Sequence, residues 1–312
     1  MNGVLIGFAV VGLAILTGYV VARIDLLGPH ARYVLSRLTF FVLNPFLLFS
    51  VLAEADLELL FSALLPVSAL AALATFAAYA LIARLAWKRP LGEVVVGALG
   101  AGYVNGNNIG IPIATYLLGD GAYAAPVILV QLLVITPVVL TILDGVSSRT
   151  TDGQHAGHLG TVMRRTLRNP MIVGAALGVL VAVTGIELPP IVAEPIGLLA
   201  GAAVPILLLS FGMSLHGQRV LTTRASRPDV LLATALKLLL MPLAAWGIGL
   251  LFGLGPHAML VVVVLASLPS AQNVFNYAQR YDVGEVLARD VVFLTTFGCL
   301  PVVFAAAVLL GA

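Results

Sequence analysis

Three asparagines lie in the middle of an apolar run that is long enough to cross a bilayer. The run covers residues 94–118, and its centre carries amides at Asn105, Asn107 and Asn108 followed by Pro112. Proline lacks the N–H of a helical hydrogen bond, and its ring clashes with the preceding turn. Because unwound backbone at membrane depth is tolerated only where it is buried or lines a cavity, the run is predicted to form two half-helices around a polar site. A Pro-kinked helix whose amides bond to its neighbours is the alternative.

A second apolar run is interrupted in the same way, at residues 267–276, where the sequence reads SLPSAQNVFN. A half-helix that starts at the midplane directs free N–H groups and a partial positive charge inward. Half-helices beginning near Ile111 and Val274 would do so from opposite sides, and together they would favour a carboxylate. The predicted substrate-binding residues are Asn105, Asn107, Asn108, Pro112, Gln272, Asn273 and Asn276.

Two ionisable residues in or near the apolar runs are further candidates for a functional role. Lys237 lies about eight residues inside an apolar run, and an ionisable group at that depth is by default a functional hypothesis. It could supply a fixed positive charge or couple flux to protons. The alternatives are a lysine that snorkels to the interface and a structural pair with Asp290. For Asp290, which follows Glu285 closely, an interfacial carboxylate is the simplest interpretation.

The composition of the chain predicts that these residues are carried by membrane-spanning helices. The chain has 312 residues, of which 61% are hydrophobic and only 10% charged, well below the ~25% charged residues of soluble domains. An all-α polytopic membrane protein is therefore predicted. Ten apolar runs have spanning length: 3–22, 33–53, 60–83, 94–118, 122–146, 170–186, 195–215, 230–253, 258–279 and 286–310.

The distribution of basic residues gives the topology. All of the 16 Lys and Arg residues except Lys237 lie in the turns that follow odd-numbered runs or at the very start of the next run. By the positive-inside rule these turns are cytoplasmic and both termini are extracytoplasmic. Five runs in 1–146 and five in 170–312 flank a basic linker at 147–169, which predicts a 5+5 inverted repeat with broken, crossing spans 4 and 9.

Several classes of protein are excluded by the motifs that the sequence lacks. It contains no nucleotide-binding glycine loop, no paired-histidine zinc motif and no G-x-S-x-G elbow, so no catalytic residue, metal site or cofactor is expected. Nothing suggests binding to nucleic acid. The single cysteine, Cys299, excludes a disulfide framework.

Four motifs and one longer segment, in order along the chain, resemble the auxin efflux carrier family, which includes the plant PIN-FORMED carriers and bacterial carriers of malonate and similar acids. They are NPF at Asn44–Phe46, N-x6-P at Asn105–Pro112, Asn169-Pro170, the run Pro205–Met213, and the segment 269–282, which resembles the bacterial members.

The resemblance implies a scaffold of spans 1, 2, 6 and 7, often dimeric, and a transport domain of spans 3–5 and 8–10 in which spans 4 and 9 cross. It places Asn105 where plant carriers have an asparagine that touches substrate. Val274 stands where the plant carriers have a second crossover proline, and the long plant loop is reduced to a short linker. Auxin itself is therefore not implied.

The function predicted from these observations is secondary active transport of a small organic anion, a mono- or dicarboxylate or an auxin-like acid, by an elevator-type alternating-access mechanism. A sodium-coupled bile-acid-type symporter is one alternative, but its sodium sites call for a carboxylate near the second crossover, where this chain has Gln272 and Asn273. Proton coupling is favoured over sodium coupling. A receptor on the same scaffold is the other alternative. A homodimer in the plasma membrane, or in the inner membrane if the protein is bacterial, is expected.

Overall fold

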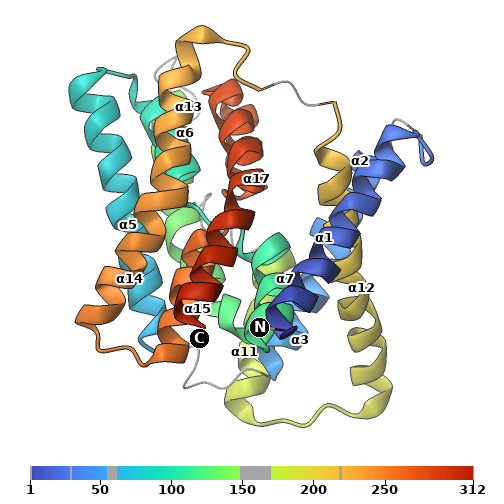
Figure 1. The fold of residues 1–312 in the computed structure, drawn as a ribbon. Coiled ribbons are helices and arrows are strands. Elements are labelled where there is room, and N and C mark those ends of the chain that lie inside the picture. The colour runs from blue at the N-terminus through green and yellow to red at the C-terminus, as the bar shows by residue number, and fades with distance from the viewer. Residues whose placement is uncertain (1, 29, 55–61, 148–169, 218–219, 312) are drawn as a thin grey trace. The chain divides into compact units, whose positions relative to one another are not determined.

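The computed structural model describes residues 2–28, 30–54, 62–147, 170–217 and 220–311 (Figure 1). Within these ranges the chain is helical apart from turns, short loops and one isolated β-bridge, which confirms the all-α class. The predicted linker at 147–169 lies outside the described residues from position 148 onward.

Five helical stretches are long and apolar enough to cross a membrane: Leu64–Ala86, Gly121–Leu143, Pro190–Ser210, Arg224–Leu251 and Glu285–Leu310. Five shorter apolar helices accompany them among the described residues: Gly12–Arg23, Phe41–Ala53, Leu91–Gly102, Pro170–Thr184 and Pro256–Ala266. Each of these long and shorter helices overlaps a different one of the ten predicted apolar runs. The chain is therefore a multi-pass membrane protein, and the ten-span inverted repeat stays a prediction.

The chain forms two compact units, and each unit draws on both predicted halves. Unit 1 comprises Met1–Phe61, Asn107–Ala125 and Thr166–Gln218. Its helices, with η marking π or 3₁₀ segments, are α1 (Asn2–Arg23), α2 (Ala31–Leu38), η1 (Thr39–Leu43), α3 (Asn44–Ala53), α7 (Ile111–Ile113), η4 (Ala114–Leu118), η5 (Gly121–Ala124), α11 (Pro170–Thr184) and α12 (Pro190–Ser214).

Glycines allow the main helix pairs of unit 1 to approach closely. Helix α1 packs on α12, and α3 packs on α11. A Cβ on Gly18 would overlap the backbone of Leu209, and a Cβ on Gly178 would overlap the backbone of Phe49. The same shift along the sequence relates Gly18 to Gly178 and Phe49 to Leu209. The predicted internal repeat would place two such contacts at matching positions.

Unit 2 comprises Ser62–Gly106, Pro126–Arg165 and Arg219–Ala312. Segments η3 (Gly106–Gly110) and α8 (Ala125–Val130) cross its boundaries. Its other described helices are α5 (Leu64–Leu81), η2 (Ile82–Ala86), α6 (Leu91–Gly102), η6 (Gln131–Ile135), α9 (Thr136–Ser147), η7 (Arg224–Ser226), α13 (Arg227–Ala235), η8 (Leu236–Leu240), α14 (Met241–Leu251), α15 (Pro256–Ser267), α16 (Gln272–Tyr281) and α17 (Glu285–Leu310).

Helix α5 packs on α6 and α14, and α17 packs on α15, α13, α16 and α6 (Figure 1). Two apolar clusters fill the spaces between these helices. One joins Leu99 of α6 to Leu143 of α9 and Val274 of α16. The other joins Val94 of α6 to Val230 of α13 and Val291 of α17. Helices α6 and α16 are therefore held by buried apolar contacts.

Four π-helical segments end two residues before a proline, at Pro45, Pro112, Pro137 and Pro242. The residue before the proline donates its N–H to a carbonyl five positions back, as Thr136 does to Gln131 and Met241 does to Leu236. This wider turn accommodates the proline ring and the missing N–H without ending the helix.

Candidate substrate site at the helix crossover

The two polar interruptions of unit 2 pair with each other. Helix α6 ends at Gly102 and α15 ends at Ser267, and the backbone beyond each is extended. Val104 and Ser270 form an antiparallel bridge. On either side of it, Asn105 donates its N–H to the Pro269 carbonyl at 2.9 Å, and Ala271 donates to the Tyr103 carbonyl at 3.0 Å. Each unwound segment thus satisfies the backbone groups of the other, which is what buried irregular backbone requires.

Two polar side chains from neighbouring helices hold this bridge. The Gln131 amide accepts from the Val104 N–H at 2.5 Å and donates to the Val104 carbonyl at 3.0 Å. The Thr295 hydroxyl accepts from the Ser270 N–H at 3.1 Å, and the Ser270 hydroxyl donates to the Gly100 carbonyl. Gln131 and Thr295 therefore form interhelical hydrogen bonds to the crossover backbone.

A network of hydroxyl groups lies beside the bridge. The Tyr103 hydroxyl bonds to that of Thr136 at 2.9 Å, and Thr136 reaches the Tyr277 hydroxyl at 3.4 Å. Asn273 lies in the first turn of α16, the helix that carries Tyr277. Sequence reasoning missed the two tyrosines. The available signal was the spacing of Asn273 and Tyr277, which are four apart and share a helix face if α16 begins at the break.

The predicted residues of the second interruption occupy the start of α16, which begins at Gln272, two residues before the expected position. Gln272 and Asn273 are half-buried, whereas Asn276 is exposed. Asn105, from the first interruption, is 4% exposed. Unit 2 therefore brings Asn105 to the same crossover as the first turn of α16.

The remaining predicted residues, Asn107, Asn108 and Pro112, belong to unit 1. Asn107 donates to the Asn108 side-chain oxygen at 3.1 Å, while the Asn107 oxygen is buried with no hydrogen-bond partner. The prediction that a half-helix begins near Ile111 is wrong, because helix resumes at Gly106 in η3. Pro112 lies inside that helix rather than in the break, since the π-helical turn before it accommodates the proline.

Comparison with known proteins gives the family. The family model described as "membrane transport protein" matches residues 4–305 of the chain. The chain belongs to this membrane transport protein family. It is 28% identical over 288 residues to an uncharacterized transporter of Methanothermobacter thermautotrophicus, a match that covers 90% of each chain.

Two rice proteins, probable auxin efflux carrier components 1b and 1d of Oryza sativa subsp. japonica, are each 27% identical over 155 residues. These matches cover 48% of this chain and 28% and 27% of the rice chains. The resemblance to auxin efflux carriers is thereby confirmed. The family is one of transporters, so the expectation that the protein is not an enzyme is also confirmed.

The two ionisable candidates of the transporter do not pair with each other. Lys237 is fully buried, and its ammonium donates to the Ala266 carbonyl at 2.7 Å and to the Met241 sulfur at 3.1 Å. Asp290 is also fully buried; it accepts from the Leu221 N–H at 2.8 Å and from Arg289 at 2.7 Å. Neither the snorkelling lysine nor the interfacial aspartate of the sequence analysis fits this burial.

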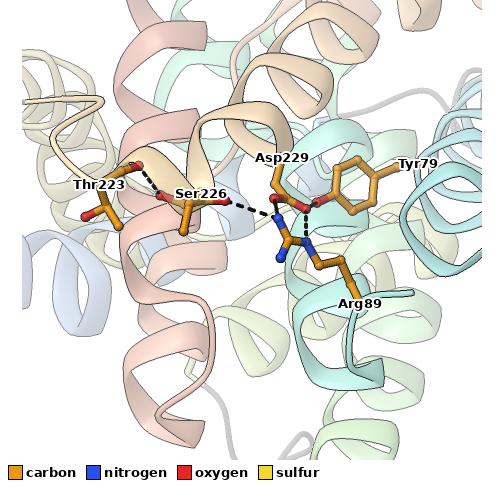
Figure 2. A network of polar contacts seen from close by, with 6 residues as sticks. Tyr79, Arg89, Thr223, Ser226 and Asp229 are labelled. Atoms are coloured by element: carbon orange, nitrogen blue, oxygen red, sulfur yellow. Dashed lines mark hydrogen bonds and ion pairs between the residues drawn. The ribbon is translucent and has the colours of Figure 1, made fainter. Parts of the chain in front are cut away.

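A third ionisable cluster in unit 2 was not anticipated (Figure 2). Arg89, in the turn between η2 and α6, holds the Asp229 carboxylate with two hydrogen bonds of 3.2 and 2.6 Å, and Tyr79 donates to the same carboxylate at 3.3 Å. The hydrogen bond to Asp229 raises the pKa of the Arg89 guanidinium above its ordinary value. Within the described residues of the transporter, no group of three or more His, Cys, Asp or Glu side chains could hold a metal ion.

Proposed function

We propose that the chain is a secondary active transporter that moves a small organic anion by alternating access of the elevator type. The observation that carries this proposal is the Val104–Ser270 bridge, which brings two interrupted helices of a membrane transport family together at the start of α16. Interrupted helices of this kind form the substrate sites of many secondary transporters.

The chemistry at the start of α16 suits a carboxylate. The first N–H groups of a helix have no partner within it, and the helix dipole adds a partial positive charge there. The amides of Gln272 and Asn273 lie in this first turn, and Asn105 is buried in the facing break. Amide and backbone N–H groups can donate the hydrogen bonds that a carboxylate loses when it leaves water. Because these donors carry no net charge, they do not leave a buried charge in the site when the substrate is absent.

The substrate class follows from this site and from the relatives. The rice proteins are named as probable auxin efflux carrier components, and auxins are small carboxylic acids. Because those matches cover under a third of the rice chains, we take from them the carboxylate and not auxin itself. Mono- and dicarboxylates and auxin-like acids are the proposed substrates.

The proposed topology has both termini outside and residues 147–169 in the cytoplasm, in a plasma membrane or a bacterial inner membrane. It rests on the distribution of Lys and Arg. The test is labelling of single cysteines at positions 155 and 257 in a Cys299→Ala background with an impermeant reagent. Labelling from outside should occur at 257 and not at 155, and the reverse pattern would reject the topology. A homodimer is proposed from the resemblance alone.

The test of function is flux in proteoliposomes. Purified protein is first screened by thermal shift against malonate, succinate, pyruvate and indole-3-acetate, and the acids that raise Tm are used as labelled substrates. Uptake into vesicles preloaded with the same unlabelled acid should exceed uptake into protein-free vesicles. A protein that binds an acid without moving it would instead be a receptor on a transporter scaffold.

A further inference from the structure

Lys237 is a fully buried lysine of unit 2. It lies in η8, the π-helical segment that precedes Pro242, and it has no exposed surface. Its ammonium donates to the Ala266 carbonyl at 2.7 Å and to the Met241 sulfur at 3.1 Å. A thioether is a weak acceptor, so the Ala266 carbonyl is the principal partner.

The contact between Lys237 and Ala266 lies at the C-terminal end of α15. Ala266 is the next-to-last residue of α15, which ends at Ser267 immediately before the crossover segment that contains Ser270. The last carbonyls of a helix have no partner within it and carry the negative end of the helix dipole. In transporters with broken helices, such half-helix C-terminal ends are where a coupling cation is coordinated. Lys237 places an ammonium at this point.

No carboxylate balances the ammonium among the residues that the structure describes. The ion pairs Arg89–Asp229 and Arg289–Asp290 do not include Lys237. The buried carboxylates of unit 2 are engaged elsewhere, Asp229 by Arg89 and Tyr79, and Asp290 by Arg289 and the Leu221 N–H. An unpaired buried charge is costly, so an ammonium at this position beside the crossover calls for a role beyond packing.

We propose that the Lys237 ammonium is a tethered cation that takes the place of a free coupling cation at the C-terminal end of α15, and so holds the crossover ready to bind an anion. A covalently attached cation cannot be released with the substrate. Anion transport therefore needs no sodium or other free metal cation. This inference rests on the proposed function for its flux predictions, whereas occupancy of the site can be tested on purified protein alone.

The experiment removes the Lys237 side chain and supplies an equivalent ammonium in solution. Lys237→Ala removes a propylammonium-shaped fragment, from Cγ to Nζ. We expect the variant to have a lower Tm than wild type and to regain stability with propylammonium but not with 1-propanol, its uncharged analogue. Wild type should gain nothing from propylammonium. In proteoliposomes, Lys237→Met should lower initial anion flux at least about tenfold, since a charged hydrogen bond is lost, and wild-type flux should be unchanged when N-methylglucamine replaces sodium.

Lys88, the only other lysine of the chain, is exposed and provides the matched control. Lys88→Gln should match wild type in every assay. Wild-type flux or stability that requires sodium would overturn the inference, and this measurement does not depend on any variant folding. Lys237→Met with wild-type flux, or Lys237→Ala with no selective response to propylammonium, would also overturn it. If wild type moves no anion while propylammonium still rescues Lys237→Ala, the proposed function fails and the tethered cation stands.

Discussion

Gln131 holds Val104 by both of its backbone groups, accepting from the N–H and donating to the carbonyl. On the other side of the bridge, Thr295 accepts the N–H of Ser270. Gln131 and Thr295 each come from the long helix that follows the interrupted one, and they lie at similar offsets from the residues they hold, 104 to 131 and 270 to 295. The crossover is therefore fixed by one polar side chain from each predicted repeat.

Replacing Gln131 with Leu should destabilise the crossover. The change leaves the Val104 N–H and carbonyl buried without partners, and each such loss costs about 1–3 kcal/mol. We expect a lower Tm in detergent and a loss of anion flux. Thr141→Val is the control in the same long helical stretch, because the Thr141 hydroxyl bonds only back to the Pro137 carbonyl of its own helix. A Gln131→Leu variant as stable as Thr141→Val would show that other contacts hold the bridge.

The pattern of residues predicted the two breaks because amides, glycines and prolines are rare together in the middle of an apolar run of spanning length. The predicted position of the first break is wrong because it depended on Pro112. The structure accommodates Pro112 with a π-helical segment and unwinds the chain at Tyr103–Asn105, which contains no proline. What stabilises that unwound segment is its pairing with Pro269 and Ala271, a long-range contact that a single sequence does not reveal.

The partners of the buried charges were beyond sequence reasoning for a similar reason. Lys237 and Asp290 were the natural pair by proximity in the predicted spans. Asp290 instead bonds to the adjacent Arg289 and to the backbone of Leu221, 69 positions away. A loop that packs against a helix has no hydrophobic periodicity that would predict the contact. A buried carboxylate that binds the loop backbone, as Asp290 does, therefore has no recognisable partner in the sequence.

Replacing Asn105 with Ala should weaken substrate binding. Asn105 is buried in the break, and its backbone N–H bonds to Pro269 whatever its side chain. Truncation should therefore keep the bridge and lower affinity for the carboxylate by about 1–3 kcal/mol, measured by calorimetry. Gln279→Ala, an exposed amide of α16, is the control and should bind normally. Unchanged binding by Asn105→Ala would place the substrate elsewhere.

Replacing Arg89 with Ala should destabilise unit 2, because it leaves the Asp229 carboxylate buried without its guanidinium (Figure 2). Arg89 is 30% exposed, so screening reduces the cost to about 2 kcal/mol, seen as a fall in Tm. The pKa of Arg89 is raised by its hydrogen bond to Asp229, so its contribution is fully present below the ordinary arginine pKa. The Tm difference from wild type should stay constant as pH rises from neutral to mildly alkaline.

The double variant Arg89→Ala with Asp229→Ala provides the control for that pair. It removes both charges together, so it should be less destabilised than the sum of the two single variants. Arg224→Ala, an exposed arginine nearby, should melt with wild type. Additive single changes would mean that the pair contributes through packing of its side chains and not through its charges.

Replacing Asp290 with Ala should loosen the point at which the chain enters unit 2. Unit 2 resumes at Arg219, and two residues later Leu221 adopts a left-handed backbone conformation with φ of 57°. That conformation is unfavourable for a leucine, and it is held by the Asp290 carboxylate on its N–H and by Arg227 on its carbonyl.

Without the carboxylate, the Leu221 N–H loses its acceptor and Arg289 loses its ion pair. We expect trypsin to cut after Arg224 faster in Asp290→Ala than in wild type, with Asp290→Asn intermediate, because the amide keeps one acceptor oxygen. Glu187→Ala, an exposed carboxylate in another loop, should be cut at the wild-type rate. Equal cutting rates in Asp290→Ala and wild type would mean that Arg227 and the apolar side chain of Leu221 fix this loop without the buried carboxylate.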